Sequence, residues 1–176
     1  MGVRAVTERR LYLLRHGKSS WRDPDLDDHD RPLAGRGRRA AKAIARHLQE
    51  QGIQPELVLC STAKRARETL ERIEPVLGRG AMCLEPGLYG AGPADLLARL
   101  HDVPPPIGSA MVIGHNPGLQ ELALLLARDG PGVRELEAKF PTGALATLAF
   151  RGAEWVVLDP GTAELIDFVR PRDFES

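Results

Sequence analysis

The sequence predicts an α/β fold in which helices cover both faces of a central, mostly parallel sheet, so that the molecule has three layers. Apolar, strand-like runs alternate with segments of helical periodicity along most of the chain, which is typical of this class. Repeats and low-complexity tracts are absent. A chain of 176 residues can bury a core without a disulfide or metal, so we expect one domain over residues 1–176.

Apolar runs place the expected strands. In chain order these runs are residues 10–16, 56–61, 81–85, 109–115, 143–150, 154–159 and 163–169. The run at 81–85 is the weakest of the set. The last three follow one another without an intervening helical segment, so we expect consecutive strands joined by turns at Arg151-Gly152 and Pro160-Gly161.

Helical periodicity places four helices between these strands. The segments are residues 32–51, 62–77, 93–100 and 117–126. Gly52 suits a C-terminal cap for the first helix. Ser61 or Thr62 can cap the second, and Asn116 can cap the fourth with Pro117 as its first residue. The expected buried stripes are Ala41, Ile44 and Leu48; Ala66, Leu70, Ile73 and Leu77; and Leu119, Leu122, Ala123 and Leu126.

Composition narrows the class of function. The chain has 24 basic and 24 acidic residues, so there is no overall charge of the kind that gathers nucleic acid or anionic lipid, and we expect neither as a partner. We find no signal peptide and no apolar stretch long enough to span a membrane. Cys60 and Cys83 do not form a metal or redox spacing, which favours a reducing compartment. These features predict a soluble, cytoplasmic protein of undetermined oligomeric state.

Three of the apolar runs end in residues that bind anions. The first ends in Arg15, His16 and Gly17, the second in Ser61 with Arg65 one turn later, and the fourth in His115 and Asn116. The carboxyl ends of parallel strands lie side by side, and ligands bind along that edge of an α/β sheet.

We therefore expect two arginines and two histidines to meet at one place. Like charges converge there only if an anion offsets their repulsion, and the N-termini of the helices after Ser61 and Asn116 would add backbone N–H donors. The preferred ligand is a phosphate-like group.

The same residues resemble the motifs of a known family. The stretches LLRHGKSSW, CSTAKRARETL and VIGHNPG resemble, in order, the nucleophile, second-arginine and second-histidine motifs of the histidine phosphatase superfamily, also called phosphoglycerate mutase-like. The resemblance covers nearly the whole chain. Its KSSW tetrapeptide, acidic stretch at residues 25–41 and compact length resemble the SixA-like phosphohistidine phosphatases in particular.

The resemblance implies a phosphoglycerate mutase-like fold and a role for each motif residue. His16 would be the nucleophile, and Arg15, Arg65 and His115 would hold the phosphoryl oxygens. Further phosphate contacts would come from Ser19 or Ser20, Gly17 and Asn116. Arg22 stands where relatives often have asparagine, which leaves its role open.

Elementary chemistry supports this assignment. Imidazole attacks phosphorus only through an unprotonated nitrogen, and neighbouring arginines disfavour a protonated His16 while stabilising charge on the transferring group. We expect a phosphohistidine intermediate on His16 that water then hydrolyses. Because Arg15, Arg65 and a protonated His115 supply the positive charge, we expect neither a metal nor another cofactor.

The leaving group bears on the substrate. An alkoxide needs a proton donor, whereas imidazole leaving from a P–N bond needs less help. Glu85 follows the third strand, where relatives that use an acid carry it, but its register is shifted. Glu85 is either the catalytic acid or an ordinary carboxylate at the end of a strand. Because it is a weak candidate for the acid, the sequence favours phosphohistidine as the substrate.

The acidic stretch after the nucleophile motif has two interpretations. Asp25, Asp27, Asp28 and Asp30 surround His29, but their spacing lacks the glycine and terminal glutamate of a calcium loop. We expect a solvated loop, which could also contact a protein substrate.

The leading hypothesis is a metal-independent phosphatase that removes phosphate from phosphohistidine on a protein, such as a phosphorelay or phosphotransfer component. One alternative is a phosphatase or mutase acting on a small phosphomonoester. The other is a phosphate-binding module without catalysis.

Overall fold

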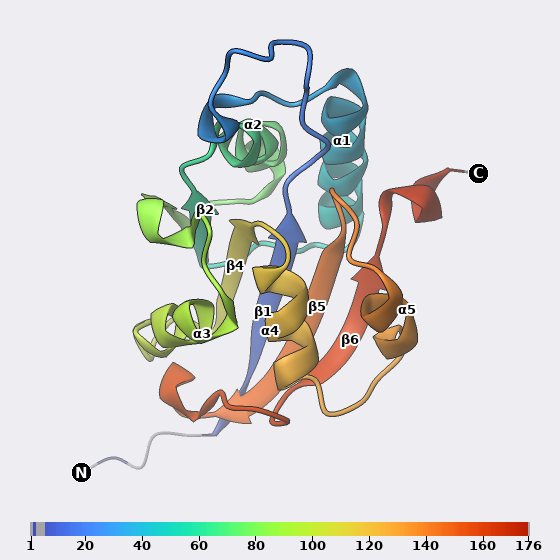
Figure 1. The fold of residues 1–176 in the computed structure, drawn as a ribbon. Coiled ribbons are helices and arrows are strands. Elements are labelled where there is room, and N and C mark those ends of the chain that lie inside the picture. Colours follow the sequence, from blue (N-terminus) through green and yellow to red (C-terminus); the bar gives the residue numbers. More distant parts are fainter. Residues whose placement is uncertain (1, 3–5, 176) are drawn as a thin grey trace.

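A six-stranded sheet forms the centre of the molecule (Figure 1). The computed structural model describes residues 2 and 6–175. In chain order the strands are β1 (Thr7–Arg15), β2 (Leu57–Ser61), β3 (Ala81–Glu85), β4 (Ser109–Gly114), β5 (Leu145–Gly152) and β6 (Glu164–Val169). Their spatial order is β3-β2-β4-β1-β5-β6. The first four strands in this order pair in parallel, and β5 pairs antiparallel with both β1 and β6. This arrangement confirms the predicted mostly parallel sheet.

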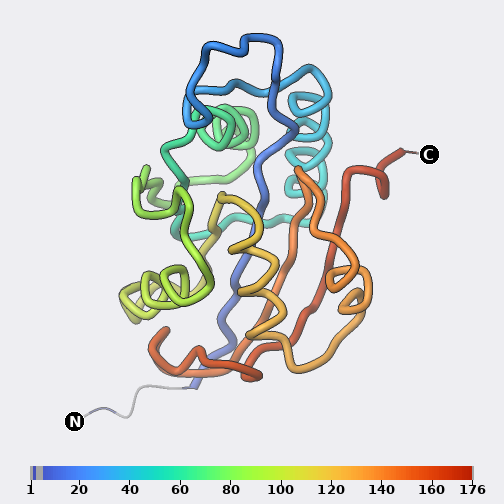
Figure 2. Tube along the Cα trace, in the orientation of Figure 1, coloured from blue at the N-terminus to red at the C-terminus, as the bar shows by residue number. Residues whose placement is uncertain are grey.

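Helices cover both faces of the sheet. They are α1 (Gly35–Glu50), α2 (Lys64–Ile73), α3 (Pro93–His101), α4 (Gly118–Leu126) and α5 (Val133–Ala138). One core packs α1 and α2 against Tyr12 and Leu14, and the other packs α3, α4 and α5 against Leu11 and Leu13. Alternate residues of β1 thus face opposite cores, as strand geometry requires. The tube in Figure 2 follows the chain from one layer to the other.

The buried stripes expected from helical periodicity are all observed. The three stripes predicted for α1, for α2 with the turn after it, and for α4 are buried throughout. Gly52 ends α1 in the left-handed conformation, as predicted, but the two N-terminal caps differ from the prediction. The cap of α2 is Ala63 and that of α4 is Pro117, with helical residues starting one position later in each case.

The predicted strand over residues 154–159 is wrong. Trp155–Val157 form a 3₁₀ turn, in which Trp155 and Leu158 are buried while Val156 and Val157 are exposed. Burial at a spacing of three fits a 3₁₀ turn, whose side chains at i and i+3 are aligned, and does not fit a strand. The indole N–H of Trp155 also donates to the carbonyl of Ile107 at 2.6 Å, which fixes the turn against the loop before β4.

The loop after β1 packs closely on the start of α1. A Cβ added to Gly17 would lie 2.7 Å from the carbonyl oxygen of Gly37, and one added to Gly37 would collide with the backbone of Lys18. Only glycine at both positions permits this approach, which sets the path of the chain just after His16. Within the described chain, no helix is both long and apolar enough to cross a membrane.

Candidate active site

The three strand tips singled out in the sequence are adjacent in the structure. β4 pairs with both β1 and β2, so Arg15, Gly114 and Cys60 lie near one edge of the sheet. The N–H of His16 donates to the carbonyl of Gly114 at 3.2 Å, which ties the first tip to the third. The topology therefore brings together His16, Arg65 and His115 from segments that are far apart in the chain.

His16 is buried and held in a defined orientation. Its Nδ1 lies 2.7 Å from the carbonyl oxygen of Gly17, which can only accept a hydrogen bond, so the ring proton is assigned to Nδ1. The lone pair is then on Nε2, where the Nε–H of Arg65 donates at 3.2 Å. Burial, followed by the charges of His115, Arg65 and Arg15, lowers the pKa of His16 to about 3, against the effect of the Gly17 carbonyl. At neutral pH, His16 therefore presents an unprotonated nitrogen next to an arginine.

Arg65 projects from the first turn of α2, as the sequence predicted. Its side chain is buried and donates to both the backbone carbonyl of Asp28, at 2.6 Å, and the carboxylate of Asp28, at 3.0 Å. One turn later, Thr69 donates to the Arg65 carbonyl at 2.7 Å and accepts the N–H of Gly17 at 3.1 Å. Thr69 thus connects α2 to the loop after His16.

Arg15 and His115 complete the site. Arg15 donates through Nη1 to the carbonyl of Phe140 at 2.9 Å, and the imidazole Nε2 of His115 lies 2.7 Å from Ser61 Oγ. The rings of His16 and His115 are 5.0 Å apart between centroids. Burial, followed by the charge of Arg65, lowers the pKa of His115 to about 4, so the expected protonated His115 is neutral in this structure near pH 7.

Two nitrogen atoms of the site have no partner. Among the described residues, the buried side-chain polar atoms without a hydrogen bond are Nε of Arg15 and Nδ1 of His115. Buried polar groups are almost always satisfied, so each of these atoms is open to a further partner. The Nε–H of Arg15 can only donate, and with other cations nearby an acceptor that fits it is an anion such as a phosphoryl group.

The acidic loop is solvated, as expected, since Asp25, Asp27, Asp28 and Asp30 are all exposed. Asp28 has a further role that the sequence did not predict. Its carboxylate accepts hydrogen bonds from Tyr89 at 2.6 Å, Arg65 at 3.0 Å and Arg31 at 2.9 Å. The Tyr89 hydroxyl, followed by the two arginines, holds the pKa of Asp28 well below its usual range despite partial burial. Asp28 thus orders Arg65 from an exposed loop.

Sequence reasoning missed Tyr89, Thr69 and Arg31. Tyr89 packs edge-on against His115, with ring centroids 5.4 Å apart, and bonds to Asp28. Tyr89 and Asp28 are 61 residues apart. The sequence gives no signal for such a pair, since the contact depends on how a loop folds back over the sheet edge.

The other predicted phosphate contacts have protein partners in this structure. Ser19 Oγ accepts from Arg31 at 2.8 Å, and the Gly17 N–H bonds to Thr69. The Asn116 side-chain amide donates to the Phe140 carbonyl at 3.1 Å and also to Gln120. Arg22 is exposed, and its backbone N–H bonds to Ser20.

Glu85 is held in an ion pair at the end of β3, where it is the register partner of Ser61. Arg99 of α3 binds both of its carboxylate oxygens, with nitrogen–oxygen distances of 2.7 to 3.0 Å. Both oxygens of the candidate acid are therefore engaged by a protein side chain in a bidentate, charge-assisted pair.

Comparison with known proteins places these motifs in context. The sequence model of the histidine phosphatase superfamily (branch 1) matches residues 11–89. The chain is 37% identical over 163 residues to the uncharacterized protein Rv1276c of Mycobacterium tuberculosis, covering 90% of this chain and all of that one. It is 36% identical over 129 residues to the uncharacterized chloroplastic protein At3g52155 of Arabidopsis thaliana, covering 68% and 59% of the two chains.

Solved structures show the same architecture. A protein of Nakamurella multipartitia described as a candidate phosphohistidine phosphatase SixA superposes with a TM-score of 0.81 at 31% identity, covering 94% of this chain and 97% of that one. A candidate SixA of Agrobacterium tumefaciens gives 0.77 at 30% identity, with coverages of 93% and 98%. A structure of the protein histidine phosphatase SixA complexed with tungstate gives 0.71 at 25% identity, also covering 93% and 98%.

Proposed function

This chain belongs to branch 1 of the histidine phosphatase superfamily, and we propose that it hydrolyses phosphohistidine on a protein through a phosphohistidine intermediate on His16. The observation that carries this proposal is the state of His16. Its Nδ1 proton is held by a carbonyl, its Nε2 is unprotonated, and Arg65 lies 3.2 Å from Nε2. The nucleophilic nitrogen of His16 therefore lies next to the guanidinium of Arg65, which can bind the phosphoryl group that His16 attacks.

In the first step, the lone pair of His16 Nε2 forms a bond to phosphorus while the bond from phosphorus to the leaving nitrogen breaks. Arg15 and Arg65 stabilise the charge on the equatorial oxygens during this in-line transfer. The proton stays on Nδ1, which donates it in a hydrogen bond to the Gly17 carbonyl, and that carbonyl offsets the positive charge that develops on the ring. Water then attacks the phosphohistidine, releasing phosphate and restoring His16.

His115 has a role that changes with the ligand. It is neutral near pH 7 in this structure, because burial and the charge of Arg65 lower its pKa. A phosphoryl dianion beside the ring favours the charged form, because an opposite charge within a few ångströms raises the pKa of an imidazole. His115 thus becomes a proton-bearing donor to a phosphoryl oxygen when the substrate binds.

The leaving group points to phosphohistidine as the substrate. Imidazole has a conjugate-acid pKa of about 6.5 and departs from phosphorus more readily than an alkoxide. Glu85, the candidate acid in the sequence, is bound by Arg99 through both oxygens. Because the acid candidate that the sequence offered is engaged in an ion pair, a substrate whose leaving group does not need an acid is favoured, in agreement with the names of the SixA structures that this chain resembles.

One comparison of substrates tests this proposal. We expect turnover of a histidine-phosphorylated protein to exceed that of para-nitrophenyl phosphate and other phosphate esters. We also expect Glu85→Gln to change turnover of the phosphohistidine protein by less than about twofold, and both activities to survive a chelator. If Glu85→Gln lowers ester turnover by roughly 10²-fold, the residue is the acid of a phosphomonoesterase instead.

The same assay separates catalysis from binding alone. A phosphate-binding module would hold the phosphorylated protein without releasing phosphate, and His16→Ala would leave that binding intact. Inactivation by chelator that Mg²⁺ or Zn²⁺ reverses would contradict the proposed chemistry, in which Arg15, Arg65 and the charged form of His115 supply the positive charge.

A further inference from the structure

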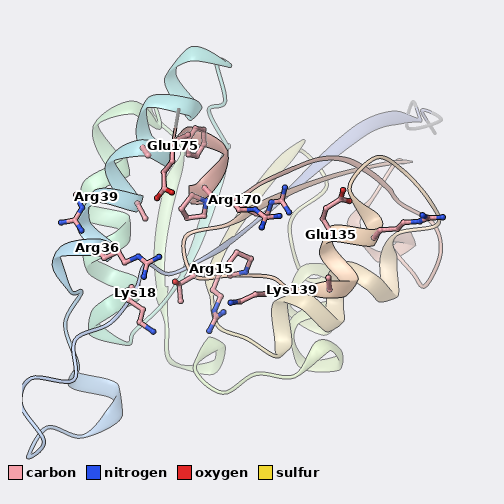
Figure 3. Close-up of a pocket in the computed structure, with 17 residues that line it drawn as sticks. Arg15, Lys18, Arg36, Arg39, Glu135, Lys139, Arg170 and Glu175 are labelled. Atoms are coloured by element: carbon pink, nitrogen blue, oxygen red, sulfur yellow. The ribbon is translucent and has the colours of Figure 1, made fainter.

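A basic cavity adjoins the candidate active site (Figure 3). It has a volume of about 1050 Å³ and lies between the N-terminal half of α1, α5 with the loop after it, and the segment that follows β6. Arg15 and Lys18 line it, but His16, Arg65 and His115 do not. The cavity is therefore a separate space that shares one arginine with the phosphoryl site.

Positive side chains dominate the lining. Among the described residues, the cationic lining consists of Arg15, Lys18, Arg36, Arg39, Arg134, Lys139, Arg170 and Arg172. The acidic lining consists of Glu135 and Glu175. Over the whole chain the charges balance, with 24 of each sign, so this excess is local. In the view of Figure 3, Arg15 lies between Lys18 and Lys139, and Arg36 lies beside Lys18.

Most of these cations lack a partner of their own. Arg170 pairs with Asp173 at 3.2 Å, but no ion pair within the described residues engages Lys18, Arg36, Arg39, Arg134 or Lys139. Gathering unpaired cations destabilises a fold by mutual repulsion. A cluster of this kind is expected where an anionic partner offsets the repulsion.

The size and lining of the cavity indicate a polypeptide. The basic surface continues past Arg39 into a second hollow of about 400 Å³ lined by Arg38, Lys42 and Arg72. The volume of the larger cavity alone is at the upper limit for a small-molecule site, so the two hollows together have more volume than a small phosphate ester fills. Among the described lining residues, Phe174 is the single aromatic, and it already packs against His47. Single-stranded nucleic acid is usually bound by stacking on several exposed aromatic rings.

We propose that this cavity binds an acidic segment of the phosphorylated protein, next to the phosphohistidine that enters the active site. The inference rests on the proposed function for the identity of the phosphorylated residue. Arg15 joins the two spaces: its Nη1 bonds to the Phe140 carbonyl beside the cavity, and its Nε is unpartnered at the phosphoryl site. The cavity would thus act in substrate selection by placing carboxylates at a fixed distance from the reacting histidine.

Two synthetic peptides test the inference. Both carry one central histidine, phosphorylated by phosphoramidate, and they differ only in flanking residues, which are glutamates in one and glutamines in the other. We expect wild type to favour the glutamate peptide by about tenfold in kcat/KM, mainly through KM, and this preference to shrink as NaCl screens the charges. Arg36→Glu combined with Arg134→Glu should remove it.

Controls separate docking from chemistry. The double variant should hydrolyse phosphoimidazole, which is too small to reach the cavity, at the wild-type rate. Arg79→Glu, an exposed charge reversal before β3 at the opposite end of the parallel strands, should keep the peptide preference. Equal kcat/KM for the two peptides with wild type would overturn the inference while leaving the proposed function intact.

Binding provides a readout that does not need turnover. Fluorescence anisotropy with the unphosphorylated peptides should show the same preference for glutamate and the same loss in the double variant. If no substrate is hydrolysed but this preference holds, the proposed function fails and the docking site stands. Equal affinity for the two peptides, or tighter binding of an oligothymidylate of matched charge, would refute the docking site.

Discussion

Arg65 contacts both the nucleophile and the carboxylate that orients it. Its guanidinium contacts His16 through Nε and Asp28 through both terminal nitrogens. Burial is the main cause that lowers the pKa values of His16 and His115, and the charge of Arg65 adds to it in both cases. One side chain thus helps to keep the nucleophile unprotonated and is itself oriented by Asp28.

Replacing Arg65 tests this account at the scale of one side chain. We expect Arg65→Ala to lower kcat/KM on the phosphohistidine protein by about 10²-fold, on the order of 3 kcal/mol, as for the loss of one preorganised donor. Arg67→Ala is the matched control, because Arg67 lies two residues along and bonds to the Thr62 carbonyl. Steady-state kinetics of the pair measures the difference, and a loss below tenfold for Arg65→Ala would show that it does not contact the transferring group.

Individual residues differ in how far the sequence could reveal them. Arg15, His16, Arg65 and His115 could be grouped because each follows a strand, and parallel strands align their ends. Asp28 could not be separated from its acidic neighbours, since only the fold of the loop brings it to Arg65. The contact between Asp28 and Arg65 is a tertiary interaction, so no local sequence pattern predicts it.

At the scale of elements, α1 supports the nucleophile through one close backbone contact. Gly37 lies in the first turn of α1, and its Cα packs against the backbone of Lys18. We expect Gly37→Ala to displace the loop after His16, lowering kcat/KM by at least about tenfold and reducing the free energy of unfolding by roughly 1–3 kcal/mol, as for overpacking.

A neighbouring glycine supplies the control for this prediction. A Cβ on Gly35 would meet only the ends of two arginine side chains, at 3.5 Å, so Gly35→Ala should preserve activity and stability. Kinetics and urea titration of both variants decide the matter. Equal behaviour of Gly35→Ala and Gly37→Ala would show that the contact does not position the loop.

The elements that the sequence failed to predict share a physical cause. α5 has six residues, of which Leu136 alone is buried, so it has little periodicity to detect. The segment over residues 154–159 is apolar, but its conformation depends on the contact of Trp155 with Ile107, which lies 48 residues away in the chain. Longer elements with full buried stripes, such as α1 and α4, were predictable because their own spacing specifies the face that packs.

At the scale of the whole molecule, the buried histidines make stability depend on pH. Burial lowers the pKa values of His16 and His115 to about 3 and about 4, against about 6.5 in the unfolded chain. Between these values the unfolded state binds protons that the folded state does not. The stabilisation is therefore complete above pH 6.5 and is lost as the pH falls, toward 4 for His115 and toward 3 for His16.

Urea titrations at several pH values measure this effect. From about pH 7.5 to about pH 4.5, we expect the free energy of unfolding to fall by roughly 2 kcal/mol for each of the two histidines. The double variant His16→Asn, His115→Asn should show a shallower dependence. If the double variant loses stability as steeply as wild type, the two imidazoles are not buried in neutral form.

The fold class follows from the pattern of elements, whereas the order of strands does not. Alternating strands and helices predict a mostly parallel sheet, and β3-β2-β4-β1 forms it. Which strand is central depends on the packing of all the crossovers at once. The position of β4 between β1 and β2 is what brings His115 close to His16.

The most direct test of the central claim is a single-turnover experiment with a protein labelled with ³²P on histidine. Wild type and His16→Asn are mixed with this substrate, quenched in alkali because phosphohistidine survives base, and digested for peptide mapping. The account predicts transient label on the wild-type peptide that contains His16 and none on the variant. Release of phosphate by wild type with no label on His16, or label on another residue, would contradict it.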